Sequence, residues 1–166
     1  MNINFLAVLM AALVPMVMGF IWYNPKVFGT AWMQAAELSE EKIKNAPMAR
    51  ILALSFLFSF LLAFTLQFVV IHQYHLYSIV ANDVKPGDTT SAAAQWLKSS
   101  LDSYGQNFRT FKHGAFHGFL MGIFLALPII GMSALYERRS AKYIWIHTGF
   151  MTVCFTIMGG ILCQWC

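Results

Sequence analysis

Residues 51–71 read ILALSFLFSFLLAFTLQFVVI, an apolar run without a Lys, Arg, Asp or Glu. A helix needs roughly 20 residues to cross the hydrocarbon core of a bilayer. Because lipid offers no hydrogen-bonding partner, each backbone amide in such a run must be bonded within its own segment. The stretch therefore predicts a transmembrane helix.

Three further runs have the same character, at residues 3–23, 114–136 and 143–165, and none has a charged side chain in its central portion. We therefore predict an all-α fold, an integral membrane bundle of four transmembrane helices that forms a single membrane domain over residues 1–166. The first run has no basic residue before it and no small-x-small cleavage site after it. We interpret it as a retained span and not as a signal peptide.

The composition favours the same interpretation. The 166 residues are 58% hydrophobic and only 11% charged, with a mean hydropathy of +0.60, whereas soluble domains are about 25% charged. The formal net charge is +4, but the basic residues fall between the apolar runs and not in one patch. Contact of the connections with the membrane surface explains them better than nucleic-acid binding, so we expect lipid and no nucleic acid as a partner.

Two of the three connections lie on one side of the membrane. In the first, residues 24–50, Ser39 is followed by two glutamates, which is typical of the start of a short helix. The third, residues 137–142, is so short that the last two spans must be antiparallel neighbours.

The second connection, residues 72–113, is the longest extramembrane segment. Apolar residues recur in it at helical spacing from Ala93 to Tyr104, and Gly105 follows as a plausible stop. We expect a helix there that lies on the membrane surface or covers the end of the bundle.

The basic residues of the connections also indicate the orientation. The first and third connections together hold seven lysines and arginines, whereas the longer second connection holds four. The positive-inside rule places the first and third connections in the cytoplasm and therefore both termini on the extracytoplasmic side.

Small residues recur every four positions along the third and fourth spans. Such stripes let helix backbones approach closely in lipid. Two interpretations stay open: the stripes pack the spans of one chain together, or one of them, on the third span, forms a homo-oligomer or binds another membrane protein. The candidate residues are Gly114, Gly118, Gly122, Thr152, Thr156 and Gly160.

Four of the five histidines fall near one membrane surface. They are His72, His75, His113 and His117. The spacings i, i+3 and i, i+4 place each pair on one helix face, where two imidazoles can share a transition metal. A haem that bridges two spans is another possibility. The alternative interpretation is that these are interfacial histidines that form hydrogen bonds in the headgroup region.

The last span ends at the same surface with Cys163 and Cys166. The pair could form a disulfide outside the cell, provide metal ligands or simply be two small side chains. The sequence contains no phosphate-binding glycine loop, no GxSxG and no HExxH, which favours a non-enzymatic protein. The spans also lack a buried charged residue, the usual mark of an ion or proton transporter.

Several short motifs from both halves of the chain resemble those of one family. They are NFLAVL at 4–9, GFIWYNP at 19–25, FGTAWM at 28–33, FKHG at 111–114, LYERRS at 135–140 and MGGIL at 158–162. The chain resembles DUF1761, a family of bacterial multi-pass membrane proteins of unknown function. The resemblance implies a location in the bacterial cytoplasmic (inner) membrane and no particular activity. Within the LYERRS motif, we interpret Glu137, Arg138 and Arg139 as a charged contact to the first connection.

The hypothesis that we favour from the sequence is a non-enzymatic helical scaffold, either a homo-oligomer or an accessory subunit of a larger membrane complex. The first alternative is a membrane protein that binds a transition metal or haem through the clustered histidines. The second is a channel or transporter for a small solute, with a path along faces lined by glycine and threonine.

Overall fold

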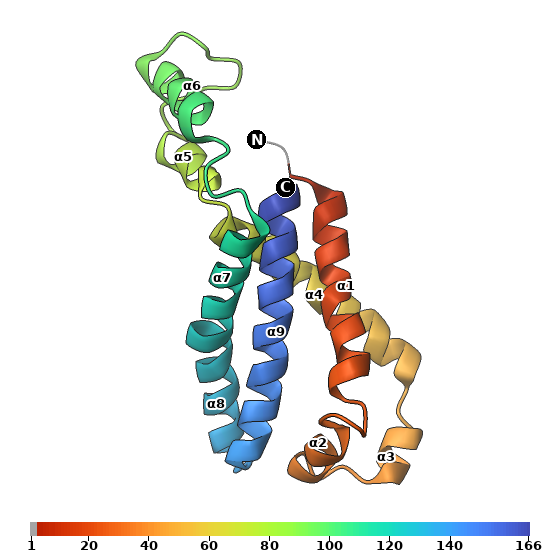
Figure 1. Ribbon diagram of the computed structural model, residues 1–166. Coiled ribbons are helices and arrows are strands. Elements are labelled where there is room, and N and C mark those ends of the chain that lie inside the picture. The colour runs from red at the N-terminus through yellow and green to blue at the C-terminus, as the bar shows by residue number, and fades with distance from the viewer. Residues whose placement is uncertain (1–2) are drawn as a thin grey trace.

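The computed structural model describes residues 3–166, and the regular structure within that range is entirely helical (Figure 1). Four helical segments in it are long and apolar enough to cross a membrane. They are α1 (Phe5–Trp22), α4 (Met48–Val70), the continuous run α7 (Phe111–Met121), η1 (Gly122–Ala126) and α8 (Leu127–Tyr136), and α9 (Ala141–Trp165). The predicted all-α bundle of a multi-pass membrane protein is confirmed.

Four shorter helices lie in the connections. They are α2 (Gly29–Ala35), α3 (Glu40–Lys44), α5 (Gln73–Ile79) and α6 (Ala92–Tyr104). The helix expected after Ser39 is present, and the Ser39 hydroxyl accepts a hydrogen bond from the backbone N–H of Lys42 at 3.2 Å. The helix expected in the second connection is α6, which ends before Gly105 as predicted. Helices α2 and α3 lie at one end of the bundle, and α5, α6, the start of α1 and the C-terminus lie at the other (Figure 1).

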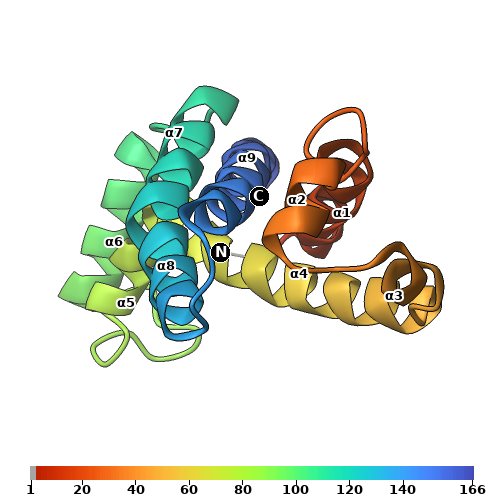
Figure 2. The same ribbon diagram turned by 90° about the horizontal axis from the view of Figure 1, so that it is seen from below.

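Helix α9 is the central span. Half of its most apolar stretch is buried within the chain (50%), against 22–28% in the other three spans. Seen from below, α9 lies between the α7–α8 segment and α1, and α4 crosses beside them (Figure 2). Cys154, Met158 and Leu162 of α9 are fully buried in the apolar core. The other spans expose large apolar side chains, as expected for surfaces that contact lipid.

The glycine stripe of the third span packs against α9 of the same chain. A Cβ atom at Gly118 would overlap the backbone carbonyl of Phe155, and one at Gly114 would overlap that of Gly159. The backbones therefore touch, which multiplies the dispersion contacts that hold helices together in lipid. The other stripe residues face the same contact: Gly122 lies against Thr152, Gly118 lies against Thr156, and Gly160 lies against the ring of Phe111. A contact between two chains would therefore have to use other residues.

A π-helical turn, η1, interrupts the third span just before Pro128. Proline lacks a backbone N–H, and its ring collides with the carbonyl four residues earlier in an α-helix. The wider π turn moves that carbonyl aside and lets the span continue as α8.

The second span ends earlier than the sequence suggests. Helix α4 stops at Val70, and Ile71 adopts an extended backbone (φ −111°, ψ 97°) with its side chain fully buried. Burial of Ile71 in the core holds this corner, after which α5 starts a new direction. His72 and His75, which we expected at the end of the span, therefore lie beyond the corner, and they do not share a continuous helix with α4.

Candidate metal centre

Three histidines from two parts of the chain meet at the end of the bundle where α1 begins and α9 ends. One ring nitrogen from each of His72, His113 and His117 lies within 4.8 Å of the other two. The Nε2 atoms of His72 and His113 are 2.8 Å apart. A tetrahedral ion with bonds of about 2.0–2.1 Å to imidazole holds its ligand nitrogens roughly 3.3 Å apart, so small side-chain rotations suffice to bind one.

The start of α7 brings two of the three histidines onto one face. Thr110 caps this helix, and its hydroxyl accepts a hydrogen bond from the backbone N–H of His113 at 3.3 Å. His117 follows one turn later, so its ring centroid lies 4.5 Å from that of His113. A helix that starts at this point is therefore what pairs the two imidazoles.

The residue that leads into α7 is strained. Phe108 has φ +62°, a left-handed conformation that is rare for a bulky side chain. Its ring lies against the cluster, with centroids 5.0 Å from His113 and 6.5 Å from His72. Strain of this kind persists only where surrounding contacts hold it, and it gathers at functional sites.

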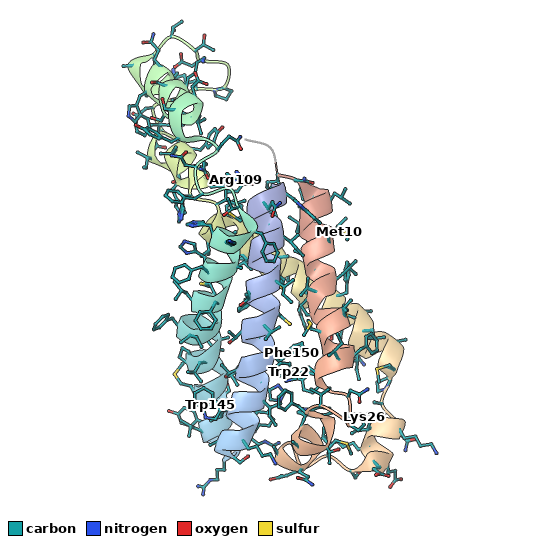
Figure 3. All side chains as sticks on the ribbon, viewed as in Figure 1. Met10, Trp22, Lys26, Arg109, Trp145 and Phe150 are labelled. Atoms are coloured by element: carbon teal, nitrogen blue, oxygen red, sulfur yellow. The ribbon has the colours of Figure 1, made fainter. Side chains whose placement is uncertain are left out.

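The end of α9 contacts both segments that carry the clustered histidines, the segment before His72 and the loop before α7. The buried Sγ of Cys163 lies 3.4 Å from the backbone carbonyl oxygen of Val70 and 3.2 Å from that of Phe108, and its single S–H can donate to either. The guanidinium of Arg109 donates in turn to the carbonyl of Cys163 at 3.0 Å, where the last helical carbonyls lack partners and the helix dipole is negative. Figure 3 shows Arg109 at this end of the bundle.

Helix α5 is held by three further hydrogen bonds. Gln73 donates to the backbone carbonyls of Tyr104 at 3.2 Å and Asn107 at 2.9 Å, which joins the residue after His72 to the loop before α7. The Tyr74 hydroxyl donates to the buried side chain of Gln67 at 3.2 Å. Burial raises the pKa of Tyr74 above its ordinary value, which already keeps the phenol protonated at neutral pH.

His75 lies outside the cluster. Its ring is exposed, and Nδ1 lies 3.3 Å from the backbone carbonyl of His72 and not beside the other imidazoles. The chain turns at Ile71, between α4 and α5. For this reason His72 and His75 do not lie on one helix face directed at α7, contrary to the prediction.

The cysteine pair is not joined in the structure, where Cys163 and Cys166 are free thiols. The two residues lie one turn apart at the end of α9 but point to different partners. Cys163 faces the core, whereas the thiol of Cys166 lies 4.0 Å from the backbone carbonyl of Asn4. Neither sulfur belongs to the histidine cluster.

The candidate ligands are three imidazoles, and this composition limits which ions could bind. Three imidazoles without a carboxylate or thiolate suit Zn²⁺, Cu²⁺ or Ni²⁺ better than Ca²⁺ or Mg²⁺, which prefer oxygen ligands. A bis-histidine haem needs two nitrogens about 4 Å apart on opposite sides of its ring, because each iron–imidazole bond is about 2 Å long. The 2.8 Å separation of His72 and His113 therefore fits a single ion better than a haem.

A protein-family model described as "Protein of unknown function (DUF1761)" matches residues 6–163. The chain belongs to the DUF1761 family. The family resemblance of the sequence motifs is thereby confirmed. No curated protein and no solved structure matches the chain. The chemistry of this DUF1761 protein must therefore be inferred from its own residues.

The sequence of this DUF1761 protein did not indicate the contacts that hold the cluster in place, although Cys163 had been named as a possible disulfide partner or metal ligand. Gln73, Arg109 and Cys163 act through backbone carbonyls far away in the sequence, and no local pattern indicates such contacts. Nor did the sequence indicate a contact at the opposite end of the bundle, where the Tyr23 hydroxyl lies 3.2 Å from Nδ1 of His147. The i, i+4 spacing of Tyr143 and His147 predicts that these two rings share a helix face, but it does not indicate the contact of His147 with Tyr23.

Proposed function

We propose that this DUF1761 protein binds one divalent transition-metal ion through His72, His113 and His117. The observation that carries the proposal is the convergence of three imidazole nitrogens, from α7 and from the corner after α4, within 4.8 Å. Interfacial histidines that only form hydrogen bonds with headgroups would gain nothing from facing one another. A metal ion binds the neutral form of each imidazole.

The site would leave one coordination position open. His72 is exposed, and the other two rings are half-buried. Three protein ligands plus one open position characterise sites that bind water or another molecule at the metal, whereas closed structural sites use four protein ligands. An ion held in this way can be exchanged or passed on.

The site would face the extracytoplasmic side of the bacterial cytoplasmic membrane. The positive-inside rule supports this orientation, because the basic first and third connections lie at the end of the bundle opposite the histidines. The start of α1 and the end of α9 adjoin each other at the histidine end, where the Asn4 side chain donates to the carbonyl of Trp165 at 2.8 Å (Figure 1).

The scaffold, the homo-oligomer and the transporter remain predictions. Among residues 3–166 we find no contact that favours one of them over the metal site. The glycine stripe that suggested an oligomer is occupied by α9 of the same chain.

A metal titration of the purified protein tests the proposal. The full chain would be purified in detergent with an affinity tag free of histidine, stripped with a chelator and titrated with Zn²⁺ by calorimetry. We expect one ion per chain, and His75→Ala should bind as the native protein does. Binding that is absent, or that is unchanged in His113→Ala, would reject the proposal.

A further inference from the structure

A second feature lies at the opposite end of the bundle from the histidines. It is a cavity of about 480 Å³ between η1–α8 and α9, with Leu62 of α4 on its far wall. Its volume lies in the range of small-molecule sites, about 300–1,000 Å³. Leu62, Leu125 and Ile129 line it and are also exposed on the outer surface of the bundle, so the cavity opens toward lipid.

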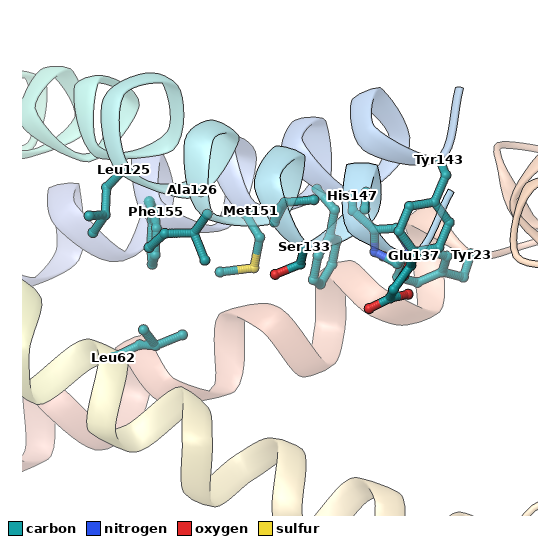
Figure 4. Close-up of a pocket in the computed structure, with 14 residues that line it drawn as sticks. Tyr23, Leu62, Leu125, Ala126, Ser133, Glu137, Tyr143, His147, Met151 and Phe155 are labelled. Atoms are coloured by element: carbon teal, nitrogen blue, oxygen red, sulfur yellow. The ribbon is translucent and has the colours of Figure 1, made fainter. Parts of the chain in front are cut away.

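The two ends of the cavity differ in polarity. Ser133, Glu137, Tyr143, Tyr23 and His147 gather at one end, and Leu62, Leu125, Ala126, Met151 and Phe155 line the other (Figure 4). The polar end lies where the spans terminate, at the level of the headgroups, and the apolar end lies deeper in the hydrocarbon region. A molecule in this cavity would therefore have the polarity and orientation of an amphiphile in the surrounding bilayer.

The polar end has unused hydrogen-bonding capacity. The hydroxyls of Ser133 and Tyr143 have no hydrogen-bond partner among residues 3–166, although both side chains line the cavity. The carboxylate of Glu137 also lines it and can only accept while ionised. The matching head group would accept from a hydroxyl and donate to the carboxylate.

The carboxylate of Glu137, which lines the cavity, disfavours an anionic head group beside it. Glu137 faces the cavity, and its partner Arg139, at 3.5 Å, is shared with Glu37, at 3.2 Å. A phosphate or carboxylate placed beside Glu137 would add a second negative charge next to that carboxylate, and the two charges would repel each other. An uncharged head group avoids that repulsion.

The wall of the cavity is held in place before any ligand binds. The Tyr23 hydroxyl pairs with Nδ1 of His147 at 3.2 Å, and the indole N–H of Trp22 donates to the carbonyl of Ile146 at 3.1 Å. The ring centroids of Trp22 and Phe150 lie 6.4 Å apart, and both residues are labelled at this end in Figure 3. These contacts fix the end of α1 against α9, so little conformational entropy is lost on binding.

We propose that this cavity binds an uncharged membrane amphiphile. A head group that carries hydroxyls or carbonyls lies among Ser133, Glu137 and Tyr143, and an apolar chain extends past Leu125, Met151 and Phe155. Acylglycerols and isoprenoid quinols share this chemistry. The proposal is independent of the metal site, because the two sites share no residue.

Photoaffinity labelling in lipid nanodiscs tests the proposal. The photoreactive ligand is a monoacylglycerol with a diazirine in its chain, and the labelled residues are mapped by mass spectrometry. We expect labels on α8 and α9 residues that line the cavity. Competition with unlabelled monoacylglycerol and with a decyl-substituted benzoquinol identifies the preferred source, and lysophosphatidic acid of matched chain length should compete less than either.

Matched variants separate the cavity from general lipid contact. Leu125→Trp fills the apolar end and should abolish cavity labelling. Leu54→Trp changes an equally exposed leucine of α4 outside the cavity (42% against 43%) and should leave labelling unchanged. Ser133→Ala keeps the packing and should weaken the apparent affinity roughly two- to tenfold, the effect of one lost hydrogen bond.

Two results would overturn the proposal. Labels spread evenly over lipid-facing residues and insensitive to Leu125→Trp and Ser133→Ala would show ordinary lipid contact. Competition by lysophosphatidic acid as strong as that of the uncharged ligands would contradict the charge argument. If Leu125→Trp fails to fold, as judged by thermal melting, Ser133→Ala and the competition series still decide the outcome.

Discussion

The Nε2 atoms of His72 and His113 lie 2.8 Å apart, although 41 positions separate the two residues in the sequence. Two protonated imidazoles would repel each other at this distance. The pair is compatible with a proton shared between the rings or with a cation that both rings bind. His117 lies one turn further along α7 and brings a third ring nitrogen to the pair. A metal ion can bind all three nitrogens, whereas a shared proton involves only two.

Removal of one ligand should nearly abolish Zn²⁺ binding. For His113→Ala and for His117→Ala we expect the affinity to fall by more than about 100-fold, beyond the 10–100-fold effect of residues that only support metal ligands. Competition with a metal-sensitive dye measures the Zn²⁺ affinity of each variant. His75→Ala is the matched control, because that ring lies close by but outside the cluster. Equal losses in all three variants would show that the histidines do not act as a specific set.

Binding should also weaken on acidification, because each imidazole must lose its proton before it can bind the ion. The same dye assay between pH 8 and pH 5 should show affinity that falls steeply as the pH falls, with protons released on binding. An affinity independent of pH would argue against imidazole ligands.

Replacement of Gly118 by leucine should destabilise the monomer itself. The new Cβ would overlap the carbonyl of Phe155 and push α7 away from α9. Overpacking of this kind costs about 1–3 kcal/mol, or more where backbone must move. Gly131→Leu is the control on the same span, because a Cβ at Gly131 meets nothing within 4 Å. Thermal melting in detergent compares the two, and equal melting temperatures would contradict the packing.

The cysteines should differ in reactivity. Cys154 and Cys163 are fully buried, and Cys166 is half-buried at the end of α9. A membrane-impermeant maleimide added to spheroplasts should modify Cys166 first, and Cys166→Ser should remove the rapid labelling. This result would also place the C-terminus outside the cell. Labelling only after lysis would reverse the orientation, and an intact mass two units lower would reveal a disulfide.

The charged contact between the first and third connections should restrain α2. Arg139 pairs with Glu37 at 3.2 Å and donates to the carbonyl of Ala36 at 3.3 Å. The Glu37 side chain is 81% exposed, so solvent screening limits the loss of global stability in Arg139→Ala to about 1 kcal/mol or less. Amide exchange around α2 should nevertheless accelerate. Unchanged amide exchange around α2 would show that the Arg139–Glu37 ion pair does not restrain this helix.

The transmembrane spans were predictable because the residues of each span alone determine that it forms a helix in lipid. Apolar composition over a bilayer thickness requires a helix whatever its neighbours are, and the caps at Ser39 and Gly105 follow from a few adjacent residues. The contact of the third connection with the first, seen in the ion pair of Arg139 with Glu37, followed from topology and charge and is confirmed.

The arrangement of the candidate site was only partly predictable. Spacing along one helix indicates that His113 and His117 share a face, but the corner at Ile71, which separates His75 from the cluster, depends on tertiary burial. Likewise, the sequence shows that the glycines of the third span allow close packing. Which helix fills that stripe is decided by the fold of the whole chain, in which α9 takes the place that a second chain could have occupied.

X-ray absorption spectroscopy of the Zn²⁺-loaded protein tests the metal site most directly, because it reports the ligand atoms themselves. We predict three imidazole nitrogens at about 2.0–2.1 Å, plus one oxygen ligand from water. His72→Ala should lose one imidazole from this shell. A sulfur shell at about 2.3 Å would instead point to the cysteines, and a shell of oxygen alone would contradict the assignment of His72, His113 and His117 as ligands.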